Sequence, residues 1–337
     1  MGSGSGTAEG IAGFWKWWPA ARGRIQGAIE GGGFDDTLVE EIAGRVAEIG
    51  AEVDWELGPG AEARHAFCLS PKGDPVLRKV TERWLRAAPA PDEIWEYHPA
   101  RRGNAEMGEA RMEIGGVELA LGEFVAAFEV DEGREVVNAT CFHPAFPRMS
   151  EDLRGTATFL MLDGALGEDG VERWLGGIEP AATAPAGARP IAELRAAIET
   201  LAGAATGERF AVMRGQDAEG RPLFITLNFA LKRIDHLACD THVAIDLGLL
   251  RPDENGLTTN DEAEQLNTIE DELAPLLADA VYFGRETRAG RRVLHYFAPG
   301  DSPGKARLTA WASRHRDRDP RVAWTDDPRW AARDRFL

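Results

Sequence analysis

Two stretches of the chain, residues 36–98 and 261–327, share one order of predicted elements: helix, strand, strand, helix, strand. The opening helix of the earlier stretch is predicted from apolar residues at three- and four-residue spacing, which are Leu38, Ile42, Val46 and Ile49. Tryptophans recur at matching places, Trp84 and Trp95 in the earlier stretch and Trp311 and Trp324 in the later one. The shared order predicts an internal duplication, and a chance match between two unrelated α+β units is the alternative.

A further strand is predicted ahead of the later stretch, because apolar residues alternate along residues 239–250. With this strand the later unit reads β-α-β-β-α-β, which is the ferredoxin-like order. Between the two units, residues 106–180 predict successive antiparallel strands and then a helix capped by Ser150, whose apolar stripe would be Phe159, Leu160, Leu162 and Leu166. The expected fold class is α+β, with two ferredoxin-like α/β units flanking a middle antiparallel β-rich region.

The clearest boundary in the chain is the segment 181–190, which consists largely of alanine, glycine and proline and has little to bury. We interpret it as a linker. The domains expected around it are a first α+β unit at 8–105, the middle region at 106–180 and the second α+β unit at 191–337. Residues 1–7, which begin MGSGSG, resemble the remnant of an expression tag and are expected to lie outside the fold.

The net charge of −18 narrows the choice of partner. Nucleic-acid affinity rests on lysine and arginine that neutralise phosphates, so this charge argues against a nucleic-acid partner and favours a basic protein. The sequence has three cysteines, Cys68, Cys141 and Cys239. Their odd number and wide spacing are not typical of a disulfide framework. Because the sequence has no apolar run of about 20 residues and no signal-peptide pattern, we expect a cytoplasmic protein with no membrane contact.

The later stretch also carries a family resemblance. Its helix of acidic residues and leucines is followed by VYFGRETRAGRRVLHYF, with a turn at Thr287 to Gly290. These features resemble the bacterial domain of unknown function 695 family and, in pattern, the regulator of ribonuclease activity B family. The FHPAF and LDGALGE segments resemble a middle region of the same bacterial proteins and of some immunity proteins to contact-dependent toxins. The resemblance implies a ferredoxin-like fold and a protein-binding or inhibitory role, and it carries over no catalytic residue.

The segment HLACDTH, residues 236–242, concentrates two histidines, a cysteine and an aspartate. An extended conformation would place His236, Asp240 and His242 on one face of a strand. A zinc site needs about four ligands, and the two histidines, separated by five residues, would supply only one pair of them. No second cluster supplies a missing ligand, so we expect no metal here and interpret the segment as strand and turn residues.

Cys141 and His143 are the other candidates for chemistry, since on a strand they would point the same way as a nucleophile and its base. The alternative is that Cys141 is a small buried hydrophobic residue. The sequence contains no phosphate-binding Walker loop, no Gly-x-Ser-x-Gly and no His-Glu-x-x-His. We therefore expect no cofactor.

Three tryptophans, Trp15, Trp17 and Trp18, cluster beside Phe14 near the N-terminus. Packing against the first α+β unit is one interpretation. The other is an aromatic anchor for a protein partner, because tryptophan is enriched at interaction hot spots.

Together these patterns predict an intracellular bacterial protein-binding module of a regulatory or immunity-like kind. The alternative is a hydrolase or a metal-dependent enzyme that uses the candidate side chains Cys141, His143, His236, Asp240 and His242. The two hypotheses diverge on one observation, which is whether these five side chains converge in a pocket.

Overall fold

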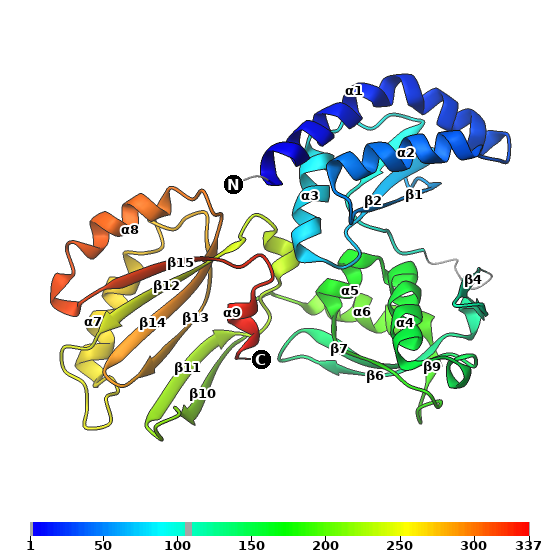
Figure 1. Cartoon of the computed structure of the whole chain (residues 1–337). Helices are drawn as coiled ribbons and strands as arrows, with labels where there is room; N and C mark the ends of the chain where they lie inside the picture. The colour runs from blue at the N-terminus through cyan, green and yellow to red at the C-terminus, as the bar shows by residue number, and fades with distance from the viewer. Residues whose placement is uncertain (1–2, 105–109, 337) are drawn as a thin grey trace. The chain divides into compact units, whose positions relative to one another are not determined.

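The computed structural model describes residues 3–104 and 110–336, and the chain folds into two compact units (Figure 1). Unit 1 consists of Met1–Val130 and Val136–Thr200, and unit 2 of Asp131–Glu135 and Leu201–Leu337. The segment 181–190, expected to be a linker, lies inside unit 1. The boundary predicted at 105–106 falls on residues outside the described part of the chain.

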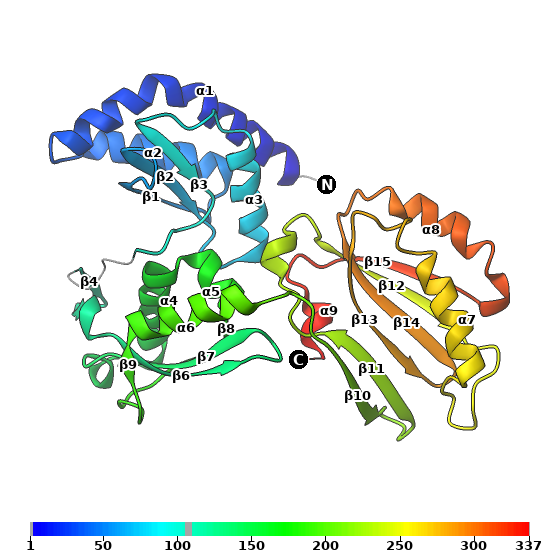
Figure 2. The same ribbon diagram turned by 180° about the vertical axis from the view of Figure 1, so that it is seen from behind.

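The first part of unit 1 is a three-stranded sheet with helices on one face (Figure 2). Its elements are α1 (Ser3–Glu30), α2 (Asp36–Ile49), β1 (Asp54–Pro59), β2 (His65–Ser70), α3 (Pro75–Arg86) and β3 (Trp95–His98). The predicted stripe of α2 is buried in full, and Asp35 caps this helix through a bond from the Leu38 amide. Alternate strand residues such as Phe67, Leu69 and Trp95 enter the helix-covered core.

The helix α1 begins at Ser3, within the Gly-Ser stretch, and is continuous with the turns that bury Phe14 and Trp18. One expectation for this part is wrong. The sheet was expected to be ferredoxin-like, yet its order is β1-β2-β3, with β2 antiparallel to β1 and parallel to β3. In a ferredoxin-like sheet a further strand would lie between the counterparts of β2 and β3. Here β3 pairs directly with β2.

The middle part of unit 1 is a four-stranded sheet with the order β8-β7-β6-β9, next to a small β4-β5 hairpin. Its elements are β4 (Arg111–Ile114), β5 (Val117–Ala120), β6 (Val125–Asp131), β7 (Val136–Phe142), α4 (Glu151–Leu166), α5 (Glu168–Trp174), β8 (Leu175–Pro180), β9 (Arg189–Pro190) and α6 (Ile191–Ala204). Ser150 caps α4 as predicted, but Phe159 is 48% exposed and lies off the buried stripe. The expected linker ends as strand β9, which pairs with β6.

Buried polar contacts join the two parts of unit 1. The Glu168 carboxylate accepts hydrogen bonds from the Ser70 hydroxyl at 2.6 Å and from the Arg101 amide at 2.8 Å. Arg78 donates two hydrogen bonds to Asp169, at 3.1 and 3.0 Å. Such bidentate contacts fix orientation as well as distance, so the sheet of the first part and α5 of the middle part hold one another in place.

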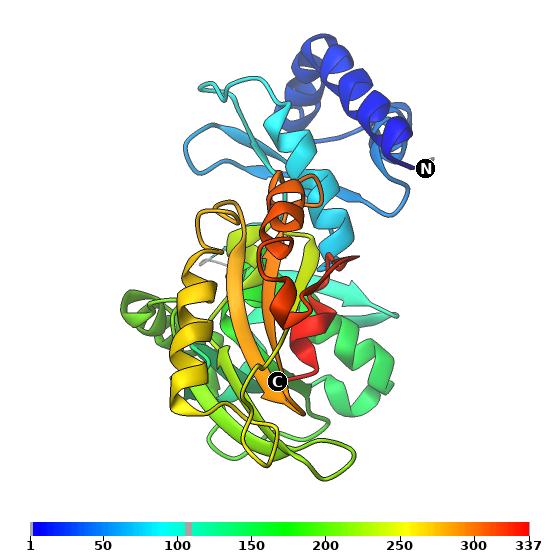
Figure 3. The ribbon, with the colours of Figure 1, turned by 90° about the vertical axis from the view of Figure 1, so that its left-hand side faces the viewer.

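Unit 2 is a six-stranded sheet with the order β10-β11-β13-β14-β12-β15, and every neighbouring pair is antiparallel. Its elements are β10 (Phe210–Gln216), β11 (Pro222–Asn228), β12 (Thr241–Gly248), α7 (Asn260–Asp271), β13 (Val281–Arg288), β14 (Arg291–Ala298), α8 (Gly304–Ala312), β15 (Arg321–Asp326) and α9 (Ala331–Asp334). From β12 to β15 the elements follow the predicted β-α-β-β-α-β order of ferredoxin-like units. The helices α7 and α8 pack on one face of strands β12 to β15 (Figure 3).

The predicted duplication is wrong, because the two sheets differ in strand order. In unit 2 the strand β12 lies between β14 and β15, whereas in unit 1 β3 lies directly beside β2. What the two stretches do share is a fully buried tryptophan in the second helix of each, Trp84 and Trp311. The molecule is a mixed α+β protein in which the β-α-β-β-α-β order occurs in unit 2.

Candidate functional site

Of the five residues of the enzyme hypothesis, Cys141 and His143 belong to unit 1 and the other three to unit 2. Cys141 is fully buried, and burial raises the pKa of its thiol to about 12. The Nδ1 atom of His143 accepts a hydrogen bond from the Ala145 amide at 3.1 Å, and its Nε2 donates to the Ala120 carbonyl at 3.0 Å. With both nitrogens engaged, His143 has no free atom to act as a base.

The residues of the HLACDTH segment have different structural roles. His236 stacks on the Trp330 ring, with centroids 6.3 Å apart. The Asp240 carboxylate accepts hydrogen bonds from the Gly300 amide and the Thr241 hydroxyl, at 2.9 and 3.1 Å. Across residues 3–104 and 110–336, no group of three or more His, Cys, Asp or Glu side chains is arranged to hold a metal ion.

His242 belongs instead to a line of polar side chains inside unit 2. Its Nε2 lies 3.1 Å from Nδ1 of His295, and Nε2 of His295 lies 3.5 Å from Glu286. Burial lowers the pKa of His242 to about 4, and the nearby His295 and Arg335 add to the effect. The His242 imidazole is therefore neutral at neutral pH.

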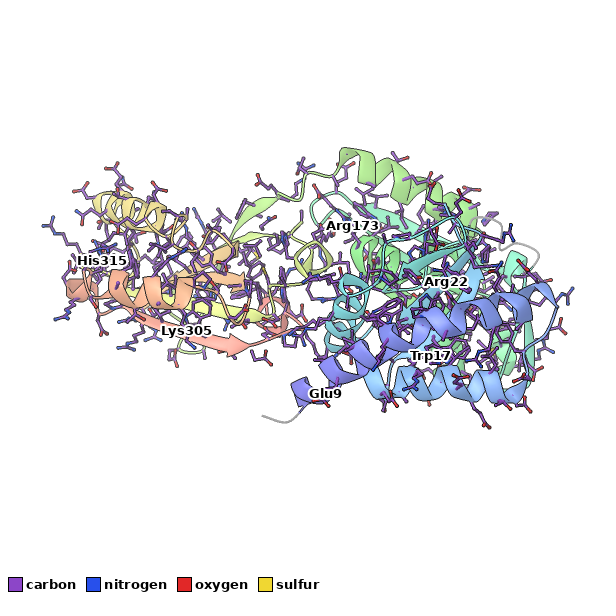
Figure 4. All side chains as sticks on the ribbon, turned by 90° about the horizontal axis from the view of Figure 1, so that it is seen from above. Glu9, Trp17, Arg22, Arg173, Lys305 and His315 are labelled. Carbon is purple, nitrogen blue, oxygen red and sulfur yellow. The ribbon has the colours of Figure 1, made fainter. Side chains whose placement is uncertain are left out.

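The N-terminal tryptophans point into the core of unit 1. Trp18 donates to the Tyr97 hydroxyl at 2.7 Å, and Trp15 donates to the Trp84 carbonyl at 2.9 Å. Trp17, labelled on α1 in Figure 4, donates to Glu41 at 2.6 Å. These contacts favour packing over the partner-anchor interpretation.

A cleft that the sequence did not point to lies on the face of the β1-β2-β3 sheet away from the helices. Strand register sets Glu56, Cys68 and His98 in one row across the sheet, while Gly58 and Ala66 pair in the row beside it. A Cβ placed on Gly58 would meet no atom within 4 Å, so the centre of this face is hollow. The cleft has a volume of about 530 Å³ and is lined by Glu56, Gly58, Pro59, Gly60, Ala61, Ala66, Cys68, His98, Arg102, Gly103, Asn104 and Arg195.

One carboxylate organises the wall of this cleft. Glu96 accepts hydrogen bonds from three successive backbone amides, those of Ala61, Glu62 and Ala63, at 2.8 to 2.9 Å. Burial alone would raise the pKa of Glu96, but these bonds outweigh burial and lower it to about 2. The ionised group also accepts from Nε2 of His98 at 2.7 Å, which fixes the plane of that imidazole.

A second feature is the outer strand of the unit 2 sheet. β10 has β11 on one side and, within residues 3–104 and 110–336, no strand on the other. All of its residues except Met213 are exposed, with Phe210 at 50% and Val212 at 67%. The position of β10 at the edge could not be predicted from the sequence, because edge position depends on the pairing of the whole sheet.

The chain was compared with known families, curated proteins and solved structures. Residues 213–337 match the model of the family of unknown function DUF695, so the C-terminal part carries a DUF695 domain, as the turn at Thr287 to Gly290 suggested. The comparisons with curated proteins and with solved structures gave no match. The family match begins within β10 and covers the rest of the six-stranded sheet. None of the helices in the described ranges has the length and hydropathy of a membrane span.

Proposed function

We propose that this protein is an intracellular protein-binding module, of a regulatory or immunity-like kind, that captures an extended segment of its partner by strand addition to β10. The observation that carries the proposal is the unpaired outer edge of β10, whose side chains are exposed on both faces of the sheet. An open strand edge presents backbone donors and acceptors at the spacing that another strand requires. Main-chain hydrogen bonds would supply most of the affinity.

The composition of β10 supports this use. Natural edge strands are commonly blocked by charged side chains, proline or a bulge. The segment FAVMRGQ has Arg214 as its one charged residue, contains no proline, and pairs with β11 without a register shift. The edge therefore lacks these protective devices, and a strand of this kind associates with other chains unless a partner covers it.

The side chains of β10 would give the interaction its selectivity. Phe210 stacks on Tyr282 with ring centroids 6.1 Å apart, and the Arg214 guanidinium lies over the Phe224 ring at 5.1 Å. Val212 lies between them on the same side of the strand. The core beneath α7 and α8 draws its residues from other strands and not from β10 or β11, so these side chains of β10 are left to contact the side chains of an added strand.

The chemistry of the partner follows from charge. Since the chain has a net charge of −18, a basic protein would be drawn to it over distances of about 10 Å at 0.1 M salt. The three cysteines are free thiols and buried, which agrees with a reducing compartment. We accordingly expect the partner to be a basic intracellular protein, and binding to weaken as salt rises.

The test compares two exposed valines in strands. Val212→Lys places a charge on the open edge of β10, and Val130→Lys, at a residue 44% exposed on β6, is the matched control. In pull-downs from native cell extract, we expect a protein that the wild type and the control retain and that Val212→Lys loses. Hydrogen exchange should then show protection of the amides of residues 210–216 in the complex.

Retention of the same protein by Val212→Lys, or failure of any protein to distinguish the two variants, would contradict the proposal. Protection of residues 210–216 that grows with the concentration of the protein alone would identify a second copy of this chain as the strand donor. That result would replace the partner proposed here by a homodimer.

A further inference from the structure

We infer that the cleft on the β1-β2-β3 sheet binds a small molecule through an oxyanion, a phosphate or a carboxylate group. This site lies in unit 1, separate from the DUF695 domain and from β10. It is therefore independent of strand addition, and either proposal can fail while the other stands.

The shape of the cleft suits a ligand of metabolite size. Its volume of about 530 Å³ falls within the roughly 300–1,000 Å³ that is usual for small-molecule sites. The floor is made by Gly58 and Ala66, which pair across β1 and β2. Because neither has a side chain beyond Cβ, a ligand can lie close to the backbone of the sheet.

The carboxylates at the cleft are already neutralised within the protein. Glu96 is surrounded by three backbone amides, His98 and Arg102. Glu56 accepts from Arg101 at 3.0 Å. Burial raises the pKa of the Cys68 thiol far above its ordinary value, so this sulfur is no anion either. The cleft therefore has little unbalanced negative charge with which to attract a cation.

Donor groups, in contrast, remain available. Arg102 uses Nη1 to contact Glu96 at 3.1 Å, and its side chain is 53% exposed. Arg195 reaches the cleft from α6, and its Nε pairs with Glu199 at 3.5 Å, leaving the two Nη groups outside that pair. Two guanidinium groups on one cleft match the fork geometry with which arginine binds phosphate and carboxylate.

Glu96 orients these donors and makes no contact of its own with a ligand in this arrangement. It accepts from Nη1 of Arg102 and from Nε2 of His98, so it holds both side chains in a fixed orientation. A donor that is held in place before binding loses less side-chain entropy when the ligand arrives. The geometry is thus that of a preorganised polar wall above an apolar floor.

The experiment titrates the full chain with inorganic phosphate and, in a separate arm, with acetate, and follows the His98 ring by NMR. We expect a saturable change of its chemical shifts at millimolar concentration with at least one anion. Arg102→Gln should weaken binding roughly tenfold, the effect of one charge-assisted hydrogen bond. Gly58→Leu should abolish it, since a Cβ at this position meets no atom within 4 Å and the longer side chain would then occupy the cleft.

The matched control is Arg221→Gln, because Arg221 is 50% exposed and, like Arg102, paired with acidic side chains, but lies in unit 2. It should bind as the wild type does. Circular dichroism of each variant separates loss of binding from loss of folding. No saturable shift with either anion, or equal binding by folded Gly58→Leu and wild type, would overturn the inference, as would an equal loss with Arg221→Gln.

Discussion

His242 is a buried imidazole that folding holds in its neutral form. Burial, His295 and Arg335 lower its pKa to about 4, and Asp327 opposes them. In the unfolded chain the same ring takes up a proton near pH 6.5. Between these two values the unfolded state binds more protons, so the free energy of unfolding falls as the pH falls from about 6.5 to 4.

We predict that His242→Gln removes this dependence. Between pH 7 and pH 5, the wild type should lose about 2 kcal/mol of unfolding free energy more than the variant does, corresponding to about 1.5 pH units at 1.4 kcal/mol each. Urea unfolding at the two pH values measures the difference. An imidazole NMR signal of His242 that titrates near pH 6.5 in the folded protein would contradict the assignment.

Single residues were predictable where the signal was local. The α2 stripe and the capping residue Ser150 of α4 both follow from short-range spacing, and both lie as expected. The role of His98 was not predictable. Its cleft depends on the register that sets Cys68 opposite His98, and on the loop that wraps Glu96, and neither is encoded in a contiguous pattern.

At the scale of elements, α7 is tied to the turn before β15 by one buried ion pair. Arg318 donates to the Glu262 carboxylate at 2.5 Å, and both side chains are at most 3% exposed. The same Glu262 oxygen accepts from the Leu250 amide at 2.9 Å. Removing one partner of such a pair leaves a buried charge without its counterpart.

We predict that Glu262→Gln destabilises unit 2 by about 3–5 kcal/mol, the usual cost of breaking a buried pair from one side. The double variant Glu262→Gln with Arg318→Met should cost less than the sum of the two single variants, because the second change removes the stranded charge. Chemical denaturation of all four proteins completes the cycle. Additive costs would mean that the pair does not couple α7 to the turn.

Element types were predicted more successfully than element neighbours. The strand β12 appears where alternation along residues 239–250 predicted it, and it completes the β-α-β-β-α-β order. The direct parallel pairing of β3 with β2 could not be predicted, because pairing is a long-range choice that local propensity does not determine. The pairing of Arg189 and Pro190, at the end of segment 181–190, with β6 is a long-range choice of the same kind.

For the whole molecule, the division into two units predicts two unfolding transitions in calorimetry. Trp84 in unit 1 and Trp311 in unit 2 are both fully buried. Alanine at either site should cost about 3–5 kcal/mol and should lower the midpoint of one transition while leaving the other in place. A single transition that both variants shift alike would show that the units unfold as one cooperative body.

Unit 2 also contains the five residues Asp131–Glu135, which precede the rest of the unit, Leu201–Leu337, in the sequence. The buried Glu135 carboxylate accepts hydrogen bonds from the Thr206 and Gly207 amides at 3.0 Å, and Lys232 donates to the Glu135 carbonyl at 3.1 Å. A fragment that begins after residue 200 would therefore lack a buried carboxylate on which the backbone of residues 206 and 207 depends, so the fold of unit 2 includes a segment that lies outside its main stretch of sequence.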